Sequence, residues 1–436
     1  MTRLVAAGLS FRTAPVAVRE AAAVSAEQSR TVLRYLVGHA GFSGAAVLST
    51  CNRTEFYVSC PDADAEDVVP RLAPYLDPSA EHDVLRHLTS RSERDAVEHL
   101  FRVAAGLESM VIGEAQVLGQ FKDAHRVAHA AGTLDARLDF VMRRAISVGK
   151  RVRSETDLGR GAGSLSDVAV AHARDVAGDL RGRGVLLVGA GKMSAQAARR
   201  LRELGARLLI TSRGASKERL AGSVEGEVVA LDALVDVAAD VDVILCSTAS
   251  GETVLDAALV RSIQRRRGDR ALCVVDLAVP RDVDPAAAGV PGVTLIDIDE
   301  LGRRHDSRLV ARGEAVPAAQ AILDTELRRT MTVIGQRDAA GPTISALNRR
   351  AEALRRREVE RAVGRAPHLD ADTRERIDML TSSLVRKLLH GPIAHLRESV
   401  DDPQVALTIR QAFDLDEREL DGTPTRTERA GGGSRV

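Results

Sequence analysis

The sequence of 436 residues predicts three domains, one α+β, one doubly wound α/β and one all-helical. Three observations support this prediction. Strand-like and helical runs are mixed over 1–157. A glycine turn then opens an alternation of apolar and helical runs over 158–300, which is typical of a parallel sheet covered by helices. The stretch 301–420 has the pattern of long helices, and 421–436 has the composition of a disordered tail.

Composition and charge exclude several classes of protein. With 44% hydrophobic and 28% charged residues, the chain has ample material for packed cores. The net charge is zero, so only local arginine clusters at 265–267 and 355–357 are candidates for phosphate binding. The four cysteines show neither CxxC pairing nor histidine spacing, which argues against zinc and fits a reducing compartment. We expect a cytoplasmic protein, because no run resembles a membrane span or a signal peptide.

The first domain begins with short strands and amphipathic helices. Apolar runs predict strands at 4–9, 45–48 and 56–59. Helical periodicity predicts helices near 26–38 and 67–76. Together these elements are typical of a small α+β domain.

A mostly helical stretch then leads to a change of composition. Ser92, followed by Asp95 three residues later, predicts a helix that starts with a capping box. The glycine-rich stretch 158–164 indicates a crossing between domains. We expect a helix from Val168 to Leu180 before the next architecture begins.

A strand, glycine turn and helix in succession predict a dinucleotide site. The apolar run Val185–Val188 leads into Gly189–Ser194. Gly189 permits the tight turn, and Gly191 lets the backbone approach a pyrophosphate at a helix N-terminus. Ser194 stands where a third glycine is usual, which weakens the match without abolishing it. Further strand-like runs lie at 208–211, 228–231, 241–246, 272–277 and 293–298.

The end of the second strand of this domain predicts the choice of cofactor. NAD-binding folds place an acidic residue there, whereas this chain has Thr211–Arg213. A hydroxyl and a guanidinium suit a 2′-phosphate, and Lys217 can add charge, so we predict NADP(H) over NAD(H). A solvated arginine in a βα loop is the alternative.

One cysteine has the surroundings of a nucleophile. Cys51 follows an apolar strand and is flanked by Asn52 and Arg53, polar groups that are expected to favour the thiolate. The alternative is a small core residue. Cys246 and Cys273 lie within apolar runs, and we interpret both as packing residues.

The C-terminal helices show no catalytic constellation. Their charged and apolar stretches at 349–357 and 380–396 suit a dimerisation module, in which a partner subunit covers an apolar stripe. Pro317 is expected to start a new helix or to kink an existing one.

These features together resemble the glutamyl-tRNA reductase family over nearly the whole chain. The resemblance rests on Leu48–Tyr57, His99–Gln120 and Val275–Asp282. Further matches are Gly189–Ser194 and Lys387–Pro392. It implies an N-terminal catalytic domain, an NADPH domain and a helical dimerisation domain joined by a long spinal helix.

The resemblance also implies a reaction. A cysteine, here Cys51, attacks the ester of glutamyl-tRNA(Glu) and forms a thioester, which NADPH reduces to glutamate-1-semialdehyde in the first step of tetrapyrrole (porphyrin) synthesis. His99 matches a functionally important histidine that assists proton transfer or orients the substrate. A homodimer and a partnership with the downstream aminomutase are implied too. For the binding of tRNA we hypothesise an arginine-bearing groove at Arg355–Arg357.

The expected site residues come from four parts of the chain. A glutamyl ammonium needs a carboxylate, such as Glu114, and its side-chain carboxylate needs a guanidinium or neutral donors. Gln116 and Gln120 are four residues apart and share a face if helical. By resemblance, the substrate contacts Thr50, Cys51, Asn52, Arg53, Ser109, Glu114, Ala115, Gln116 and Gln120. The cofactor contacts Gly189, Ala190, Gly191, Lys192, Met193, Ser194, Ser212 and Arg213.

Several residues depart from the family pattern. Phe11 stands where many members have histidine, and Lys192 and Ser194 replace a common glutamate and glycine. Gly313 and Pro317 interrupt the expected spinal helix. These changes concern cofactor affinity and helix straightness rather than the reaction.

Two other functions remain as alternatives. An NADP-dependent dehydrogenase of the quinate and shikimate type would have a similar nucleotide domain but would need neither Cys51 nor tRNA. A non-catalytic regulatory homologue would use the helical domain for assembly.

Overall fold

The computed structural model describes residues 2–61, 65–77, 83–159, 164–248, 250–268, 270–306, 315–366, 368–399 and 403–415. The chain forms two compact units, Met1–Leu327 and Arg328–Val436, which we describe separately. Within the described ranges, no helix has the length and apolar character that a membrane crossing requires. The tail predicted to be disordered, 421–436, and Gly313 lie outside these ranges.

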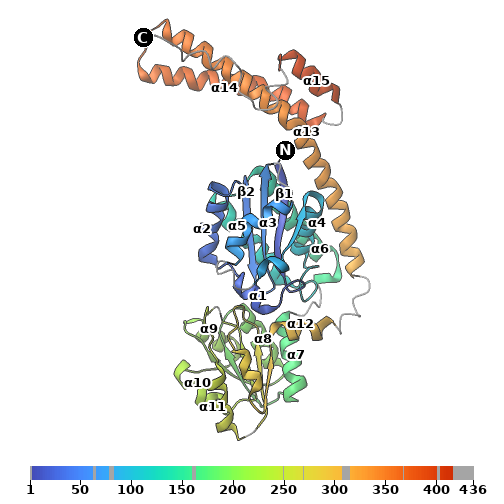
Figure 1. Ribbon diagram of the computed structural model, residues 1–436, viewed down its shortest axis with the longest axis vertical. Helices are drawn as coiled ribbons and strands as arrows, with labels where there is room; N and C mark the ends of the chain where they lie inside the picture. The colour runs from blue at the N-terminus through green and yellow to red at the C-terminus, as the bar shows by residue number, and fades with distance from the viewer. Residues whose placement is uncertain are drawn as a thin grey trace. The chain divides into compact units, whose positions relative to one another are not determined.

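The first unit begins with a four-stranded antiparallel sheet in the order β2-β3-β1-β4 (Figure 1). Its strands are β1 (Thr2–Ser10), β2 (Gly44–Thr50), β3 (Arg53–Pro61) and β4 (Thr89–Ser92). The accompanying helices are α1 (Val16–Ala21), α2 (Ala26–Gly38), α3 (Ala65–Leu76), α4 (Glu93–Ala105), α5 (Ala115–Ala131) and α6 (Ala136–Glu155), with 3₁₀ turns η1 (Val84–His87) and η2 (Asp157–Gly159). α4 packs on β1, and α5 packs on β2. The predicted strands and helices of this part are confirmed.

The predicted capping box at Ser92 is wrong. Ser92 is the N-cap of α4, but its side chain makes no capping hydrogen bond. The reason is that Ser92 also ends β4, where it pairs with Val5, and that Glu93 then has a left-handed φ of +49°. The Glu93 carboxylate instead accepts the Leu4 N–H at 3.0 Å, which ties the helix start to β1.

A six-stranded parallel sheet follows in the order β10-β9-β8-β5-β6-β7. Its strands are β5 (Gly184–Val188), β6 (Arg207–Thr211), β7 (Glu227–Val228), β8 (Val243–Cys246), β9 (Leu272–Asp276) and β10 (Val293–Ile296). Its helices are α7 (Leu165–Ala177), α8 (Lys192–Glu203), α9 (Ser216–Val224), α10 (Leu234–Ala238), α11 (Ala257–Arg267) and α12 (Ile298–Asp306), with η3 (Leu231–Ala233) and η4 (Pro285–Gly289). One apolar core lies on each face of the sheet, which confirms the doubly wound prediction.

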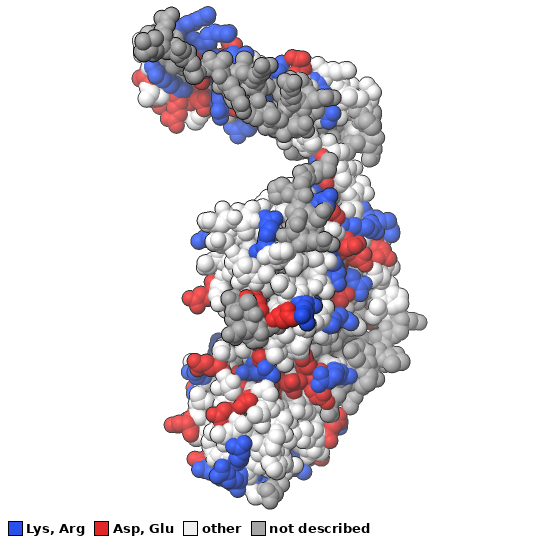
Figure 2. Space-filling view, viewed as in Figure 1, with Lys and Arg blue, Asp and Glu red and all other residues white. Residues whose placement is uncertain are grey.

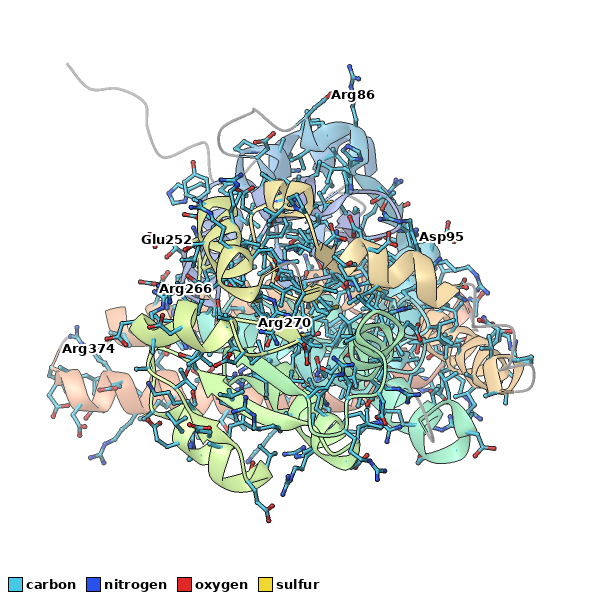
Figure 3. The ribbon with its side chains drawn as sticks, turned by 90° about the horizontal axis from the view of Figure 1, so that it is seen from below. Arg86, Asp95, Glu252, Arg266, Arg270 and Arg374 are labelled. Carbon is cyan, nitrogen blue, oxygen red and sulfur yellow. The ribbon has the colours of Figure 1, made fainter. Side chains whose placement is uncertain are left out.

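Three details of this sheet differ from the prediction. The run 228–231 contributes only the edge strand Glu227–Val228, which is exposed, because η3 begins at Leu231. α7 ends at Ala177 rather than Leu180, since Gly178 follows with a φ of +77°. Within the cluster 265–267, Arg267 is not available to phosphate, because it is 3% exposed and donates to backbone carbonyls of Ala238, Ala239, Val241 and Ala271. Figure 3 labels its neighbours Arg266 and Arg270.

The remaining helices are α13 (Ala315–Gly364), α14 (Ala371–Glu398) and α15 (Pro403–Ala412). Pro317 lies in the first turn of α13, so it starts a new helix, which is one of the two expected outcomes. A small core in the second unit includes Leu347, Leu389 and Leu396. The C-terminal all-helical prediction is confirmed.

α14 carries an apolar stripe that the described part of its unit leaves uncovered. Leu380, Leu384 and Leu388 are 62%, 50% and 74% exposed. They are four residues apart and lie on one face of the helix. A stripe of this kind is typical of a surface that another subunit covers.

Leu384→Asp is expected to turn a dimer into monomers, because a carboxylate would be buried without a partner in the subunit interface. Light scattering after size exclusion measures the mass. Glu375→Ala, at an exposed position nine residues before Leu384 and therefore on the opposite side of the same helix, is the control and should stay dimeric. A dimeric Leu384→Asp variant would show that the stripe is not the interface.

Candidate functional site

The candidate nucleophile lies in the tight turn of a β-hairpin. β2 and β3 pair in register as far as Thr50 and Arg53, so only Cys51 and Asn52 form the turn. The Thr50 hydroxyl accepts hydrogen bonds from the N–H groups of Asn52 and Arg53 at 3.2 Å each. The Asn52 carbonyl accepts a hydrogen bond from the Phe11 N–H at 2.8 Å. The backbone therefore holds the thiol in one place.

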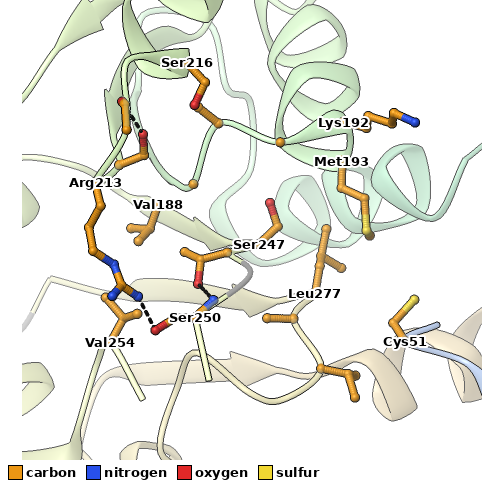
Figure 4. A pocket seen from close by; sticks show the side chains of 18 of the residues that line it. Cys51, Val188, Lys192, Met193, Arg213, Ser216, Ser247, Ser250, Val254 and Leu277 are labelled. Atoms are coloured by element: carbon orange, nitrogen blue, oxygen red, sulfur yellow. Dashed lines mark hydrogen bonds between the residues drawn. The ribbon is translucent and has the colours of Figure 1, made fainter. Parts of the chain in front are cut away.

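Cys51 and the glycine turn line the same cavity, of about 1470 Å³ (Figure 4). Cys51 and Met193 lie at one end of the view, and Arg213 and Val254 lie at the other. The lining also includes Leu277, which follows β9. The nucleophile and the predicted dinucleotide site thus share one space at the carboxyl ends of parallel strands, where α/β folds bind ligands.

The glycine turn fits a dinucleotide. Gly189 has a φ of +110°, and a Cβ there would lie 2.6 Å from the Ser247 carbonyl oxygen, so only glycine is accommodated. Gly191 is the N-cap of α8, and a Cβ there would have open space around it. Lys192 and Met193, the first residues of α8, line the cavity, so the helix N-terminus is available to a pyrophosphate.

Ser194 does not line this cavity. Its side chain is fully buried, and its hydroxyl is hydrogen-bonded to that of Ser247 at the end of β8. The serine therefore packs α8 against the sheet, as the third glycine of the motif does by its smallness.

The residues predicted to select the cofactor lie together at the end of β6. Ser212, Arg213 and Ser216 line the cavity. The Arg213 guanidinium donates to the Ser250 hydroxyl across the cavity mouth (Figure 4). Lys217 donates to the Ser212 carbonyl at 3.1 Å, which brings its charge to the same turn.

A narrow pocket of about 20 Å³ beside Cys51 gathers nearly all the predicted substrate residues. The members of that prediction that line it are Thr50, Cys51, Asn52, Arg53, Ser109, Glu114, Gln116 and Gln120. Ala115 lines only the larger cavity and a neighbouring one. Gln116 and Gln120 border both the narrow pocket and the large cavity, so the two spaces adjoin at these side chains.

The electrostatics correct one expectation about the thiol. Burial and the charge of Glu114 raise the pKa of Cys51 to about 12, against the lowering effect of Arg19 and Arg53. The thiolate is therefore not favoured in the substrate-free protein. Burial likewise raises the pKa of Glu114 to about 7, although a backbone hydrogen bond from Leu165 opposes this shift.

His99 reaches the pocket only through another residue. Among the described residues lining the two cavities, His99 is absent. Its Nε2 lies 3.0 Å from Glu55 Oε2, while Arg53 donates to Glu55 Oε1 at 2.7 Å. Burial tends to raise the pKa of Glu55, but His99 and Arg53 hold it well below its usual range.

Sequence reasoning missed Glu55, although a signal was present. Arg53, Glu55 and Tyr57 alternate along β3 and so share one face, and the Tyr57 hydroxyl donates to Glu55 at 2.7 Å. All three side chains are buried. Polar residues alternating on one face of a strand that is otherwise apolar predict a buried polar network.

Arg19 and Asp299 were missed without any such signal. Arg19 is 2% exposed and donates to the Cys51 carbonyl and to the Asp299 carboxylate. Asp299 lies 280 residues further along the chain. No local pattern in the sequence connects the two.

Family models match the chain in three consecutive parts. The N-terminal domain of glutamyl-tRNA(Glu) reductase matches residues 7–156, shikimate/quinate 5-dehydrogenase matches 171–303, and the reductase dimerisation domain matches 318–415. The middle match agrees with the glycine turn, so the protein has a nucleotide-binding domain for a dinucleotide cofactor.

Relatives match over almost the whole chain. The chain is 38% identical over 433 residues to the glutamyl-tRNA reductase of Desulforudis audaxviator, which covers 97% of this chain and 96% of the relative. It is 39% identical over 435 residues to that of Sorangium cellulosum, covering 94% and 82%. The solved glutamyl-tRNA reductase from Methanopyrus kandleri is 31% identical, with coverage of 94% and 99% and a TM-score of 0.46. On the identity and coverage of its curated relatives, this chain belongs to the glutamyl-tRNA reductase family.

Proposed function

We propose that this protein reduces glutamyl-tRNA(Glu) to glutamate-1-semialdehyde with NADPH and releases the tRNA, the first step of tetrapyrrole biosynthesis. The observation that carries the proposal is the single cavity that Cys51 and the glycine turn both line. A cysteine that accepts an acyl group from an ester must lie beside the hydride donor that reduces it, because the reacting atoms have to meet at about 3 to 3.5 Å.

Cys51 divides the reaction into two easier steps. Its sulfur forms a bond to the ester carbonyl carbon, the bond from that carbon to the tRNA oxygen breaks, and the oxygen takes up the thiol proton. The chemistry that NADPH supplies when bound is a hydride for the thioester carbonyl. Breakage of the carbon–sulfur bond then releases the aldehyde and leaves the Cys51 thiolate, which takes up a proton from water to regenerate the thiol.

The substrate itself would activate the thiol. Glu114 supplies a carboxylate for the ammonium of the glutamyl group, and this pairing neutralises the charge that helps raise the pKa of Cys51. Arg19 and Arg53 would then act on the thiol with less opposition, so the thiolate becomes accessible only when the ester is in place.

The side-chain carboxylate of the glutamyl group would meet Arg53, Gln116 and Gln120, all of which border the narrow pocket. His99 acts indirectly, because it is hydrogen-bonded to Glu55, and Glu55 in turn accepts a hydrogen bond from the Arg53 guanidinium. We therefore assign His99 to orientation of the pocket wall rather than to proton transfer with the ester.

NADPH is the proposed dinucleotide. Ser212, Arg213 and Lys217 supply hydroxyl and cationic groups at the turn where a 2′-phosphate would lie. Lys192 adds a positive side chain at the N-terminus of α8, beside the site proposed for the pyrophosphate.

The remaining assignments follow the same family relationship. We propose that 1–157 is catalytic, that 158–300 binds NADPH and that 301–420 forms the homodimer, with a cytoplasmic location.

For tRNA binding we propose a groove at Arg355–Arg357. Figure 2 shows basic and acidic side chains intermingled on the face in view, so this proposal is supported by the local arginine cluster and not by a broad basic patch. The cluster is also paired internally, since Arg355 contacts Glu352 and Asp378. Transfer of the aldehyde to the aminomutase is proposed from the reactivity of that product.

The quinate and shikimate type of dehydrogenase is less well supported. The corresponding family model matches 171–303 and leaves the cysteine hairpin unexplained. A non-catalytic homologue is disfavoured because the thiol, Glu114 and the glycine turn border connected cavities.

Cys51→Ser is expected to lower formation of glutamate-1-semialdehyde by roughly 1000-fold or more, because a hydroxyl is a far weaker acyl acceptor than a thiol. The assay incubates the protein with glutamyl-tRNA and NADPH and measures the aldehyde. Cys246→Ala, which removes a buried thiol outside the cavity, is the control and should keep most turnover. Equal turnover by the Cys51→Ser variant would rule out the thioester route.

Arg213→Ala is expected to raise the KM for NADPH by roughly 10- to 100-fold, since a hydrogen bond to a charged group is worth about 1.5–3 kcal/mol. The KM for NADH should change little, because NADH has no 2′-phosphate. Steady-state kinetics with both cofactors provide the measurement, and exposed Arg219→Ala on α9 is the control. Equal effects on both cofactors would contradict the assignment.

A further inference from the structure

We infer that α1 positions the nucleotide-binding domain over Cys51 through two ion pairs, Glu20 with Arg281 and Arg19 with Asp299, which we call the α1 clamp. The inference rests on the proposed function, because it concerns how the hydride donor and the acylated thiol are brought together. The members of the clamp are positioning residues, since none of them lines the large cavity in the described part of the chain.

The first ion pair is bidentate. Arg281 donates from Nε and Nη2 to the two oxygens of Glu20, at 2.9 and 2.7 Å. The Arg281 backbone N–H also donates to Glu20, at 2.5 Å. The two side chains are only 23% and 17% exposed, so solvent screens this pair less than it screens a surface pair.

The loop that carries Arg281 also forms a wall of the cavity. Leu277, Ala278 and Val279 line the cavity just before Arg281. The Asp276 carboxylate accepts the Ala278 N–H at 3.0 Å and the Val283 N–H at 2.9 Å, so the loop is braced at both ends. A displacement of Arg281 would therefore also displace the residues against which a dinucleotide would lie.

The second ion pair is linked to the backbone of Cys51. The buried Arg19 guanidinium donates to the Cys51 carbonyl and to one oxygen of Asp299. The other oxygen of Asp299 accepts the Val16 N–H at 2.8 Å, at the start of α1. Asp299 lies in the first turn of α12, just after β10, so one guanidinium joins the nucleophile's own residue to the nucleotide-binding domain.

Two attachments constrain more than one does. Arg19 and Glu20 are adjacent on α1, yet they reach different segments of the parallel-sheet domain, the first turn of α12 and the loop after β9. Two ion pairs constrain the orientation of that domain more than one ion pair would, in addition to the apolar packing of Val16 and Met110 against it. Figure 1 shows α1 where the N-terminal sheet faces this domain. Gln116 and Gln196 add a neutral contact at 2.6 Å.

The Glu20–Arg281 pair of the clamp should affect only the second half of the reaction. Acylation uses Cys51, Glu114 and Gln116, all on the N-terminal side of the cavity. Hydride transfer needs the nucleotide-binding domain at the correct distance, and a misplacement of about 1 Å can cost roughly 100-fold in rate.

The test separates the two half-reactions in Glu20→Ala, Arg281→Ala and the double variant. Acylation of Cys51 is followed without NADPH by the release of tRNA in a single turnover, and reduction is followed after NADPH is added. We expect acylation within about twofold of the wild type and reduction slower by roughly 100-fold. The double variant should be no slower than either single variant, because both remove the same contact.

Three further variants distinguish loss of this ion pair from a general loss of structure. Arg281→Lys keeps the charge but not the bidentate fork, so it should fold and still reduce the thioester slowly. Arg202→Ala breaks an exposed ion pair with Glu225 inside the parallel-sheet domain and should change neither half-reaction. The charge exchange Glu20→Arg with Arg281→Glu should recover roughly tenfold over the single changes, as expected for a direct pair.

The outcomes distinguish the clamp from the proposed function. Absence of acylation in the wild type would contradict the proposed function. Normal acylation together with wild-type reduction in the Arg281→Ala and Arg281→Lys variants would overturn the clamp. An equal loss of both half-reactions would also overturn it, because that result indicates a structural role alone.

Discussion

The two-residue turn at Cys51 and Asn52 is the constraint on which the rest of the site depends. A turn this short has little conformational freedom, because β2 and β3 are in register up to its edges and the Thr50 hydroxyl accepts hydrogen bonds from the N–H groups of Asn52 and Arg53. A one-residue slip in register would turn the side chains of a strand to the opposite face. The register of the hairpin therefore determines where the thiol lies on the large cavity.

Buried polar side chains behind the turn contribute both to stability and to the pocket wall. Glu55 bonds Arg53 and His99 out of water, and removing one partner of the buried Arg53–Glu55 ion pair is expected to cost about 3–5 kcal/mol. The pKa of Glu55 is depressed, so its contribution to stability is present above its ordinary pKa and is lost only as pH falls through the depressed value. Cys51 shows the opposite tendency, since burial and Glu114 raise its pKa and favour the neutral thiol.

Local patterns predicted most of the fold, and long-range contacts account for what they missed. The helix at 26–38 begins with a capping box at Ser25, so its bounds were readable from the sequence. The Ser92 start was misjudged because a strand pairing overrides the local capping signal. The thiolate expectation failed for a related reason, since desolvation and Glu114 act in three dimensions. Arg19 and Asp299 carry no local pattern at all.

The central claim is that Cys51 accepts the glutamyl group, and the mass of the intact protein after acid quenching tests it most directly. With glutamyl-tRNA and no NADPH, we expect one glutamyl adduct that maps to Cys51. Its rate of formation should rise as pH passes about 7, where Glu114 becomes a carboxylate. The rate should fall above about 8, where an α-amino group loses its proton. An unmodified protein, or an adduct on any other residue, would contradict the account.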